Sequence, residues 1–534
     1  MKFVTRSLLF LLALYGVVFA IGDWYLVHSG ADLWFAVIFA VVFIGLQYLV
    51  APYIIQWVLG ISWCDEGAKL PDANREFLER LCAERGLKMP RIGIIYSGTP
   101  NAFSFGHVPS DARVVVTSGL LEVLTPEESN AVLAHELGHV EHWDFAVMTI
   151  AALAPLLLYQ IYIVTNRINN TRLVAYGAYV CYLLSQYVVL MLNRTREYFA
   201  DHYAAEVTHA PSLLASALVK IAYGMVREEG EYQRVMAMGD KEDKASAAKM
   251  RRLAGTVALM GISNVRSGSA LALAQANPME AAAVMKWDLV NPWARFYELS
   301  STHPLTALRV RELNRDAEAM HQSVEYPLPQ DQKLRWNKFP LEFLVWVLPV
   351  LSGAALVTTF WFPYVFRWLD VELPANFRPM LLMALGVTWF ARILYRYRGE
   401  FADANVGALL EDLEVSQMRP RAVRMKGKIV GRGEPGAFWS ADLVLRDQTG
   451  IIFLLYRSSI PFARYIFGTV NADQYEGQDV VVEGWFRRGL VPYVEMSKLT
   501  DQNGKSRRLY SRWIQCAAAA ACVVLGWLWF SGSI

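Results

Sequence analysis

Long apolar runs dominate the pattern of hydrophobic and polar positions along this chain. A helix that crosses a bilayer needs about 20 mostly apolar residues. Seven runs approach or exceed that length: Ser7–Leu26, Leu33–Ile54, Phe145–Val164, Val174–Leu192, Leu341–Phe366, Met380–Leu394 and Trp513–Phe530. The sixth run is short and the third contains Pro155, and the third and fourth could instead form a hairpin of partly buried core helices. The pattern therefore predicts a mainly α-helical, multi-span membrane protein.

The pattern changes between residues 399 and 510, where short segments rich in β-branched and aromatic residues replace the long apolar runs. Five segments are typical of strands: Arg421–Val430, Ala441–Leu445, Ile451–Tyr456, Gln478–Trp485 and Val491–Met496. Asp447–Gly450 and Arg487–Gly489 stand where tight turns are expected. The region therefore predicts a small all-β barrel similar to an OB-fold.

Composition narrows the class of protein and the partners of the barrel. Hydrophobic residues make up 54% of the chain and charged residues only 19%, which supports a membrane protein. Barrels of this kind often bind nucleic acid through basic and aromatic faces, but the net charge of +2 gives no basic excess. We therefore expect the 399–510 domain to bind a protein partner or to self-associate, and we do not expect it to bind nucleic acid. The five cysteines form no CxxC pair and are interpreted as free thiols.

Basic residues near the apolar runs predict the orientation of the chain, because Lys and Arg are enriched in cytoplasmic loops. Lys2 and Arg6 precede the first run, three arginines follow the sixth, and Lys505 begins a basic segment before the seventh. Arg167 and Arg172 argue weakly for an orientation opposite to the one that these basic residues indicate. The first run could also be a cleaved signal peptide. The pattern places the segment after the second run and the barrel on the cytoplasmic side of a membrane that we take to be the bacterial inner membrane.

The pentapeptide His135-Glu136-Leu137-Gly138-His139 carries the candidate chemistry. Thr125-Pro126-Glu127-Glu128 before it has the residues of a helix N-terminus with a capping box. Residues four apart on a helix share one face, so both imidazoles can reach one metal ion, and Glu136 is placed to take a proton from water. The HExxH helix lies outside the apolar runs, which argues against a metal within the bilayer core.

A third metal ligand must come from elsewhere, because the position of the third His in extended HExxH sites is Phe145. Glu197 and Asp201 lie four apart near the end of the fourth apolar run, on one helical face. Glu197 could bind zinc, and Asp201 could accept a hydrogen bond from a ligating His. A solvated salt bridge with the flanking arginines explains Glu197 equally well. The weaker rivals for third ligand are His202, Glu141 and His142.

Four segments in order resemble the membrane-embedded zinc endopeptidases of the HtpX and CAAX-protease type. They are Pro100-Asn101-Ala102-Phe103-Ser104-Phe105-Gly106, the HELGH run, Arg196-Glu197-Tyr198-Phe199-Ala200-Asp201, and Ser301-Thr302-His303-Pro304 with Arg309 and Leu313. The resemblance covers roughly residues 1–315. The stretch 224–296 looks long and irregular, and everything after about residue 330 has no counterpart in the short HtpX-like members. Residues 225–276 could form a lid over the cleft, although a packing subdomain or linker is the simpler interpretation.

The resemblance implies a fold and a set of roles. It implies a gluzincin-type α+β protease domain that holds one Zn²⁺ through His135, His139 and Glu197. Glu136 would be the general base, Asp201 would support a ligand, and the substrate backbone would lie beside Asn101 and Ala102. We expect the substrate to add a strand beside Arg113–Thr117. His303 could stabilise the oxyanion of the reaction, or it could simply belong to a His-Pro turn.

Together these patterns predict a domain order and a function. The domains are two N-terminal spans (1–60), a protease domain (61–330) interrupted by a transmembrane or hydrophobic hairpin (145–192), spans five and six (331–398), the barrel (399–510) and a last span (511–534). The expected function is a membrane zinc endopeptidase that cleaves membrane or membrane-associated proteins, in quality control or processing. The alternatives are a CAAX-type prenyl-peptide protease and a non-catalytic scaffold with a structural zinc site.

Overall fold

Two compact units make up the chain in the computed structural model, and each is described by itself. The first comprises Met1–Ala272 and Phe296–Gln330, and the second Leu273–Arg295 and Asp331–Ile534. The structure describes residues 33–98, 100–167, 171–221, 278–361, 373–432, 442–458, 467, 473–489 and 492–533. The predicted span Ser7–Leu26 and the segment 225–276 lie outside these residues. The predicted domain boundaries stay a prediction.

A four-stranded sheet forms the core of the first unit, in the order β1-β2-β4-β3. Its strands are β1 (Ser62–Trp63), β2 (Arg91–Ile95), β3 (Ala102–Phe105) and β4 (Arg113–Thr117). β4 pairs in parallel with β2 and antiparallel with β3. The prediction that substrate adds a strand beside Arg113–Thr117 is therefore wrong, because both edges of β4 are already paired. The two edge strands of this sheet are β1 and β3, and β3 is the longer of them, with four residues against two.

The HExxH segment lies on α5 (Pro126–Glu141), whose start is fixed by local chemistry. Thr125 accepts a hydrogen bond from the backbone N–H of Glu128, and Glu128 accepts one from the N–H of Thr125. This is the capping box that the sequence predicted. α5 packs against β3 and α3 (Asp72–Arg85), and most of its residues are buried. The helix is therefore held rigidly at the centre of the unit.

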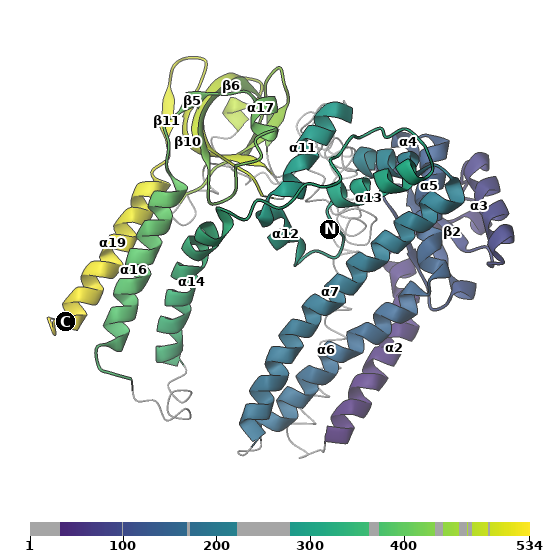
Figure 1. The fold of residues 1–534 in the computed structure, drawn as a ribbon, viewed down its shortest axis with the longest axis horizontal. Coiled ribbons are helices and arrows are strands. Elements are labelled where there is room, and N and C mark those ends of the chain that lie inside the picture. Colours follow the sequence, from purple (N-terminus) through teal and green to yellow (C-terminus); the bar gives the residue numbers. More distant parts are fainter. Residues whose placement is uncertain are drawn as a thin grey trace. The chain divides into compact units, whose positions relative to one another are not determined.

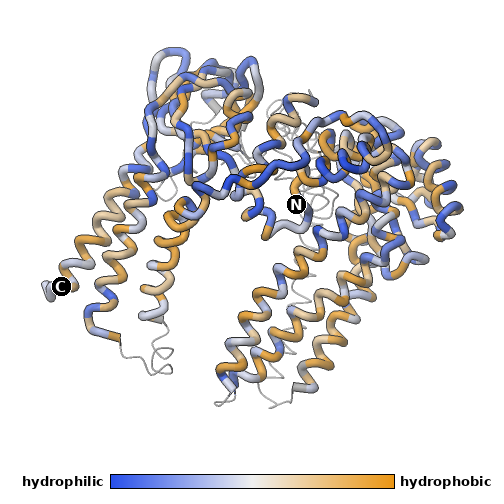
Figure 2. Tube along the Cα trace, viewed as in Figure 1, coloured by the Kyte–Doolittle hydropathy of each residue, from blue (hydrophilic) through white to orange (hydrophobic). Residues whose placement is uncertain are grey.

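Three long apolar helices extend from the first unit, and Figure 2 shows apolar residues along their length. They are α2 (Leu33–Leu59), α6 (Asp144–Asn166) and α7 (Arg172–Thr208), and all three are long and apolar enough to cross a membrane. Only 6 to 17% of their most apolar stretches is buried inside the protein. This exposure favours spans over the alternative of buried core helices for the third and fourth runs. α7 is one continuous helix that extends well past its apolar part (Figure 1). Glu197 and Asp201 lie on this extension, so the span and the two carboxylates belong to the same helix.

The second unit contributes three more helices that could cross a membrane: α14 (Phe339–Trp361), α16 (Phe377–Arg396) and α19 (Ser511–Phe530). α16 and α19 pack closely because two glycines face the neighbouring helix. A Cβ atom at Gly386 would lie 2.6 Å from the carbonyl oxygen of Ala519, so only glycine fits there. Six of the seven predicted spans thus appear as helices among the described residues.

A closed five-stranded barrel forms the rest of the second unit. Its strands are β6 (Arg421–Arg432), β7 (Leu443–Arg446), β8 (Ile451–Leu455), β9 (Asp479–Arg487) and β10 (Tyr493–Thr500). Pairing runs β6–β7–β8–β10–β9 and returns to β6, with β8 and β10 parallel and the other pairs antiparallel. The barrel prediction is confirmed, and each strand begins and ends within a few residues of its predicted bounds.

One predicted turn of the barrel differs from expectation. The loop at Asp447 is a tight turn in which the Asp447 carboxylate accepts from the backbone N–H groups of Thr449 and Gly450. At the second predicted turn, Arg487 is instead the last residue of β9, and both Arg487 and Arg488 are fully buried. The remaining elements are α4 (Ser118–Val123), α11 (Pro278–Val290), α12 (Pro292–Glu298), α13 (Thr306–Ala319), α17 (Val406–Leu410), β5 (Ala402–Asp403), β11 (Ser506–Arg508), the apolar helix Pro211–Ile221 and short 3₁₀ turns at Cys64–Glu66, Pro109–Asp111 and Asp473–Tyr475.

Candidate metal centre

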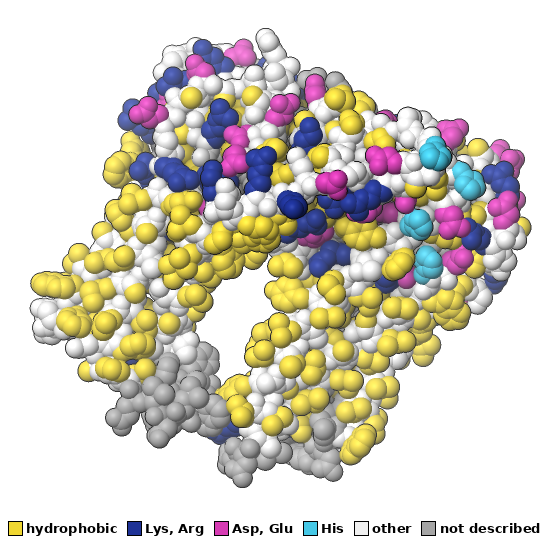
Figure 3. Space-filling view, in the orientation of Figure 1, with side chains coloured by type: hydrophobic (Ala, Val, Ile, Leu, Met, Phe, Trp, Pro, Cys, Tyr) yellow, Lys and Arg dark blue, Asp and Glu magenta, His cyan; other side chains and the backbone are white. Residues whose placement is uncertain are grey.

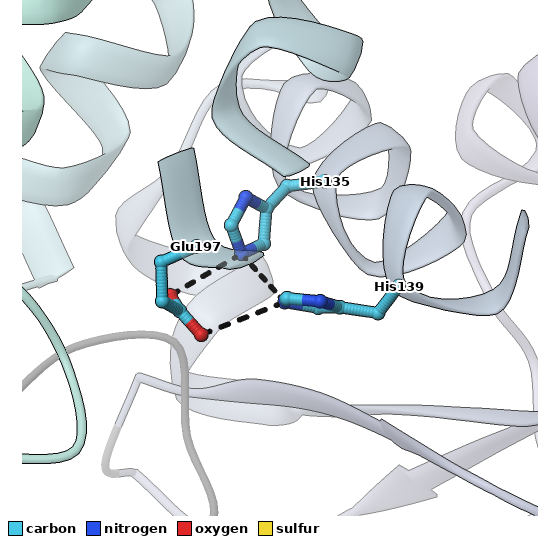
Figure 4. Close-up of side chains that lie close together, drawn as sticks. All are labelled: His135, His139 and Glu197. Carbon is cyan, nitrogen blue, oxygen red and sulfur yellow. Dashed lines mark hydrogen bonds and ion pairs between the residues drawn. The ribbon is translucent and has the colours of Figure 1, made fainter. Parts of the chain in front are cut away.

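Helix α5 brings the two histidines of the HExxH segment side by side. The Nε2 atoms of His135 and His139 lie 3.2 Å apart, and His135 is completely buried. Both rings project from successive turns of one face toward the same point (Figure 4). Glu136, between them in sequence, is also buried. The spacing predicted from the sequence thus produces a pair of convergent imidazoles.

Glu197 approaches the same point from helix α7. Its Oε2 atom lies 3.8 Å from Nε2 of His135, and its Oε1 atom lies 3.7 Å from Nε2 of His139. Among the described residues these three are the group whose ligand atoms could hold one metal ion, all within 4.8 Å of one another. Zn²⁺ binds nitrogen and oxygen ligands at about 2.0–2.2 Å. Separations of this size between donors are compatible with one central ion, so the residues fit zinc.

A buried carboxylate and a buried arginine stand behind His135. Oδ1 of Asp201 lies 3.0 Å from Nδ1 of His135, on the side of the ring away from Glu197. Arg309 holds Asp201 with two hydrogen bonds of 2.6 and 2.8 Å. Burial would lower the pKa of Arg309, but the carboxylates of Asp201 and Glu197 raise it. The guanidinium therefore stays charged and fixes the carboxylate that orients His135.

His139 has an equivalent support that the sequence analysis missed. Oδ2 of Asp144 lies 2.6 Å from Nδ1 of His139, and Nη2 of Arg196 lies 2.7 Å from the same oxygen. Burial lowers the pKa of His139, but Asp144, Glu197 and Glu136 together raise it. The raised pKa of His139 reflects the negative charge of these carboxylates, and the same charge favours the binding of a metal cation beside them. The sequence feature that could have revealed Asp144 is its position, because it is an acidic residue at the start of the apolar helix α6.

Replacing Asp144 with Asn should weaken zinc binding without removing a ligand. The amide keeps the shape of the side chain but loses the charge that faces His139 and Arg196, so we expect a roughly 10- to 100-fold rise in the zinc dissociation constant. Competition with a chromophoric chelator measures this directly. Asp316→Asn is the matched control, because Asp316 faces the exposed His202 at 3.2 Å and should not affect the metal. Equal zinc affinity in wild type and Asp144→Asn would contradict the role of Asp144.

Of the remaining candidate residues from the sequence, the structure brings His303 to the metal position and places His202, His142 and Glu141 away from it. Nδ1 of His303 lies 3.1 Å from Oε2 of Glu197, so His303 reaches the site. The side chain of His202 is 63% exposed and faces Asp316 instead. His142 contacts the rings of Phe199 and Tyr203, and neither it nor Glu141 joins the three-residue group.

Ala102 is the first residue of the edge strand β3, which packs against α5, and Asn101 directly precedes it. The backbone N–H of Asn101 donates to Oγ1 of Thr117, and the Asn101 side chain accepts from the N–H of Ala102. These bonds fix the strand where it passes the HExxH helix. The arrangement places a strand edge and a candidate metal site within one rigid unit.

A strand edge beside an HExxH helix, with spans leading from the same unit, defines a membrane metalloprotease. The family model "Peptidase family M48" matches residues 72–317. The "Protease HtpX homolog" of Methanothermobacter thermautotrophicus is 37% identical over 222 residues, which cover 41% of this chain and 83% of that relative. The chain therefore belongs to peptidase family M48, among the HtpX homologues, and the resemblance noted in the sequence is confirmed.

Two further relatives and one solved structure are similar to this chain. The "Protease HtpX homolog" of Moorella thermoacetica is 34% identical, over 38% of this chain and 71% of the relative. The "Protease HtpX homolog 2" of Methanosarcina acetivorans is also 34% identical, over 39% of this chain and 74% of the relative. The crystal structure of S. mikatae Ste24p has a TM-score of 0.37 and 18% identity, over 58% of this chain and 65% of that chain.

Proposed function

We propose that this protein is a zinc-dependent endopeptidase whose active site is built from α5 and α7. The observation that carries the proposal is the convergence of His135, His139 and Glu197 on one point, with Glu136 beside them on α5. Two histidines and one carboxylate leave a coordination position open, as in catalytic rather than structural zinc sites. When bound, zinc would polarise the scissile carbonyl and acidify a water molecule.

The residues of the chain itself would carry the proton transfers. Glu136 takes the proton from the attacking water and passes it to the leaving amine, since a buried carboxylate next to the reacting atoms can act as base and then as acid. His303, beside Glu197, is positioned to stabilise the oxyanion as the carbonyl becomes tetrahedral. Asp201 and Asp144 keep the two imidazoles in the tautomer that offers Nε2.

The substrate would bind in an extended conformation along β3. This strand is one of the two edge strands of the sheet, it packs against α5, and it begins at Ala102, directly after Asn101. A free strand edge recognises backbone N–H and C=O groups, so it selects an unfolded peptide rather than a particular side chain. This mode supports cleavage within many different polypeptides and replaces the predicted pairing with β4.

The substrates we propose are membrane or membrane-associated proteins, in quality control or processing. The spans α2, α6 and α7 belong to the same unit as the site, which supports substrates that are close to a bilayer. The distribution of Lys and Arg supports an active site and barrel on the cytoplasmic side of the bacterial inner membrane. The barrel would recruit a protein partner or hold an oligomer. A CAAX-type prenyl protease and a non-catalytic scaffold with structural zinc are the less favoured alternatives.

Assays with an unfolded polypeptide and with a prenylated peptide distinguish the proposed endopeptidase from the two alternative functions. We expect the purified, zinc-loaded protein to cleave an unfolded model polypeptide at several internal sites, because an edge strand reads the backbone. A short prenylated peptide should be cleaved no faster than its unprenylated counterpart. Mass spectrometry of the products measures both reactions. Cleavage restricted to the prenylated peptide would favour the CAAX-type activity, and zinc binding with no cleavage of either would favour the scaffold.

A further inference from the structure

A polar cavity lies in the second unit, where α16 and α19 meet the barrel. Its volume is about 120 Å³, and its lining includes Tyr397, Trp485, Glu495, Ser497, Arg512 and Trp513. α16 ends at Arg396 and α19 begins at Ser511, and both helices are candidate membrane spans. The cavity is therefore expected at the level where the spans leave the bilayer, among lipid headgroups.

Positive charge exceeds negative charge beside this cavity. Oε2 of Glu495 lies 2.9 Å from Nε of Arg487, 3.3 Å from Nη2 of Arg396 and 3.6 Å from Nη1 of Arg457. Tyr397 donates its hydroxyl to the other oxygen of Glu495. Three guanidinium groups around one carboxylate leave an excess of two positive charges. Arg487 and Glu495 are buried, so solvent screens this excess poorly.

Trp485 and Arg512 bring further hydrogen-bond donors to the cavity. Trp485 is only 6% exposed, and its indole N–H has no hydrogen-bond partner in the part of the chain that the structure describes. A buried N–H without an acceptor costs free energy, so an acceptor bound in the cavity would stabilise this part of the protein. Arg512 also lines the cavity and has no carboxylate within ion-pair distance among the described residues; its guanidinium lies 5.7 Å from the ring of Trp513.

We propose that this cavity binds the phosphate headgroup of an anionic phospholipid. Phosphate oxygens would accept from Trp485 and Arg512 and would balance the excess charge around Glu495. A lipid is favoured over a soluble phosphate because the cavity lies beside two spans, where acyl chains can continue along α16 and α19. Trp513 and Tyr510 at the start of α19 are 67% and 62% exposed, as in the aromatic belts of membrane proteins. Figure 3 shows basic side chains where the apolar helices meet the barrel.

The site is separate from the zinc residues and does not depend on the proposed protease activity. Every residue that forms it belongs to the second unit, whereas His135, His139 and Glu197 belong to the first. Binding would fix the barrel relative to α16 and α19, since the ligand contacts both a strand residue and a helix residue. The lipid would then act as a structural partner of this unit.

Native mass spectrometry of the full-length, delipidated protein tests the proposal. Phosphatidylglycerol should bind at least about tenfold more tightly than phosphatidylcholine, and millimolar inorganic phosphate should not replace it. Arg512→Gln should weaken phosphatidylglycerol binding about fivefold, the effect of one basic residue near a headgroup. Trp485→Phe, which keeps the aromatic ring but removes the N–H, should weaken it about two- to tenfold.

Lys428→Gln is the matched control, because it removes one charge from the exposed surface of β6, which does not line the cavity. It should bind phosphatidylglycerol as the wild type does. Arg512 lies at the start of α19 rather than in the barrel core, so its variant keeps the test valid if Trp485→Phe unfolds. Equal binding of the two lipids, or unchanged affinity in Arg512→Gln, would overturn the proposal. Inorganic phosphate binding as tightly as phosphatidylglycerol would assign the cavity to a soluble anion and also overturn it.

Discussion

Replacing Glu136 with Gln should reduce peptide cleavage by about 100- to 10,000-fold, the usual contribution of a general base. Glutamine has nearly the same shape as glutamate, but it cannot take a proton from water at neutral pH. Zinc should remain bound at the wild-type level, because Glu136 is not one of the three residues that converge on the metal position. The measurement is initial rate on an unfolded polypeptide together with zinc content by mass spectrometry.

Glu127→Gln is the control for this experiment. Glu127 is exposed in the first turn of α5, so the same substitution on the same helix should leave both rate and zinc content unchanged. A Glu136→Gln protein that retains full zinc and full activity would show that another group activates the water. Loss of zinc together with activity would show instead that Glu136 supports the metal.

Replacing Glu197 with Ala should remove both zinc and activity. The change deletes a ligand, so zinc binding should weaken by more than the roughly 10- to 100-fold expected when a supporting carboxylate is lost. The protein should still fold, because Arg309 keeps its two hydrogen bonds to Asp201 when Glu197 is gone. Zinc affinity by chelator competition and the thermal unfolding midpoint of the apoprotein measure the two effects separately.

Glu206→Ala separates loss of a ligand from loss of any acidic residue on α7. Glu206 lies on the same helix and forms an exposed ion pair with Arg85 at 2.8 Å. Because exposed ion pairs contribute little to stability, this variant should keep zinc and activity. Full zinc occupancy in Glu197→Ala would refute the third ligand and direct attention to His303, the remaining histidine that contacts Glu197.

The fold was predictable wherever local chemistry is strong. The cap at Thr125 fixes α5, and spacing alone puts His135 and His139 on one face. Long apolar runs predicted the spans, and short β-rich segments predicted the barrel strands, because both signals are carried by neighbouring residues. Glu197 could be selected from its spacing to Asp201, but only the continuation of α7 beyond its apolar part brings it to α5.

The missed features depend on contacts between distant segments. The order β1-β2-β4-β3 places β4 inside the sheet, and no local pattern reveals which strands lie at its edges. Asp144 resembles an ordinary charge at the start of a span until the fold brings it to His139. Arg487 and Arg488 have the composition of a turn, but the Arg487 guanidinium donates to Glu495 and to the backbone carbonyl of Arg396, which keeps it buried. Pairings of this kind are set by tertiary structure.

The most direct test of the central claim is a zinc titration of the apoprotein. Metal is removed with a chelator, zinc is added back in steps, and bound zinc and cleavage of an unfolded polypeptide are measured in the same samples. If His135, His139 and Glu197 hold one catalytic ion, activity should be absent at the start and rise in proportion to bound zinc until one ion per chain is reached. Full cleavage by the metal-free protein, or one bound zinc per chain with no cleavage, would contradict the account.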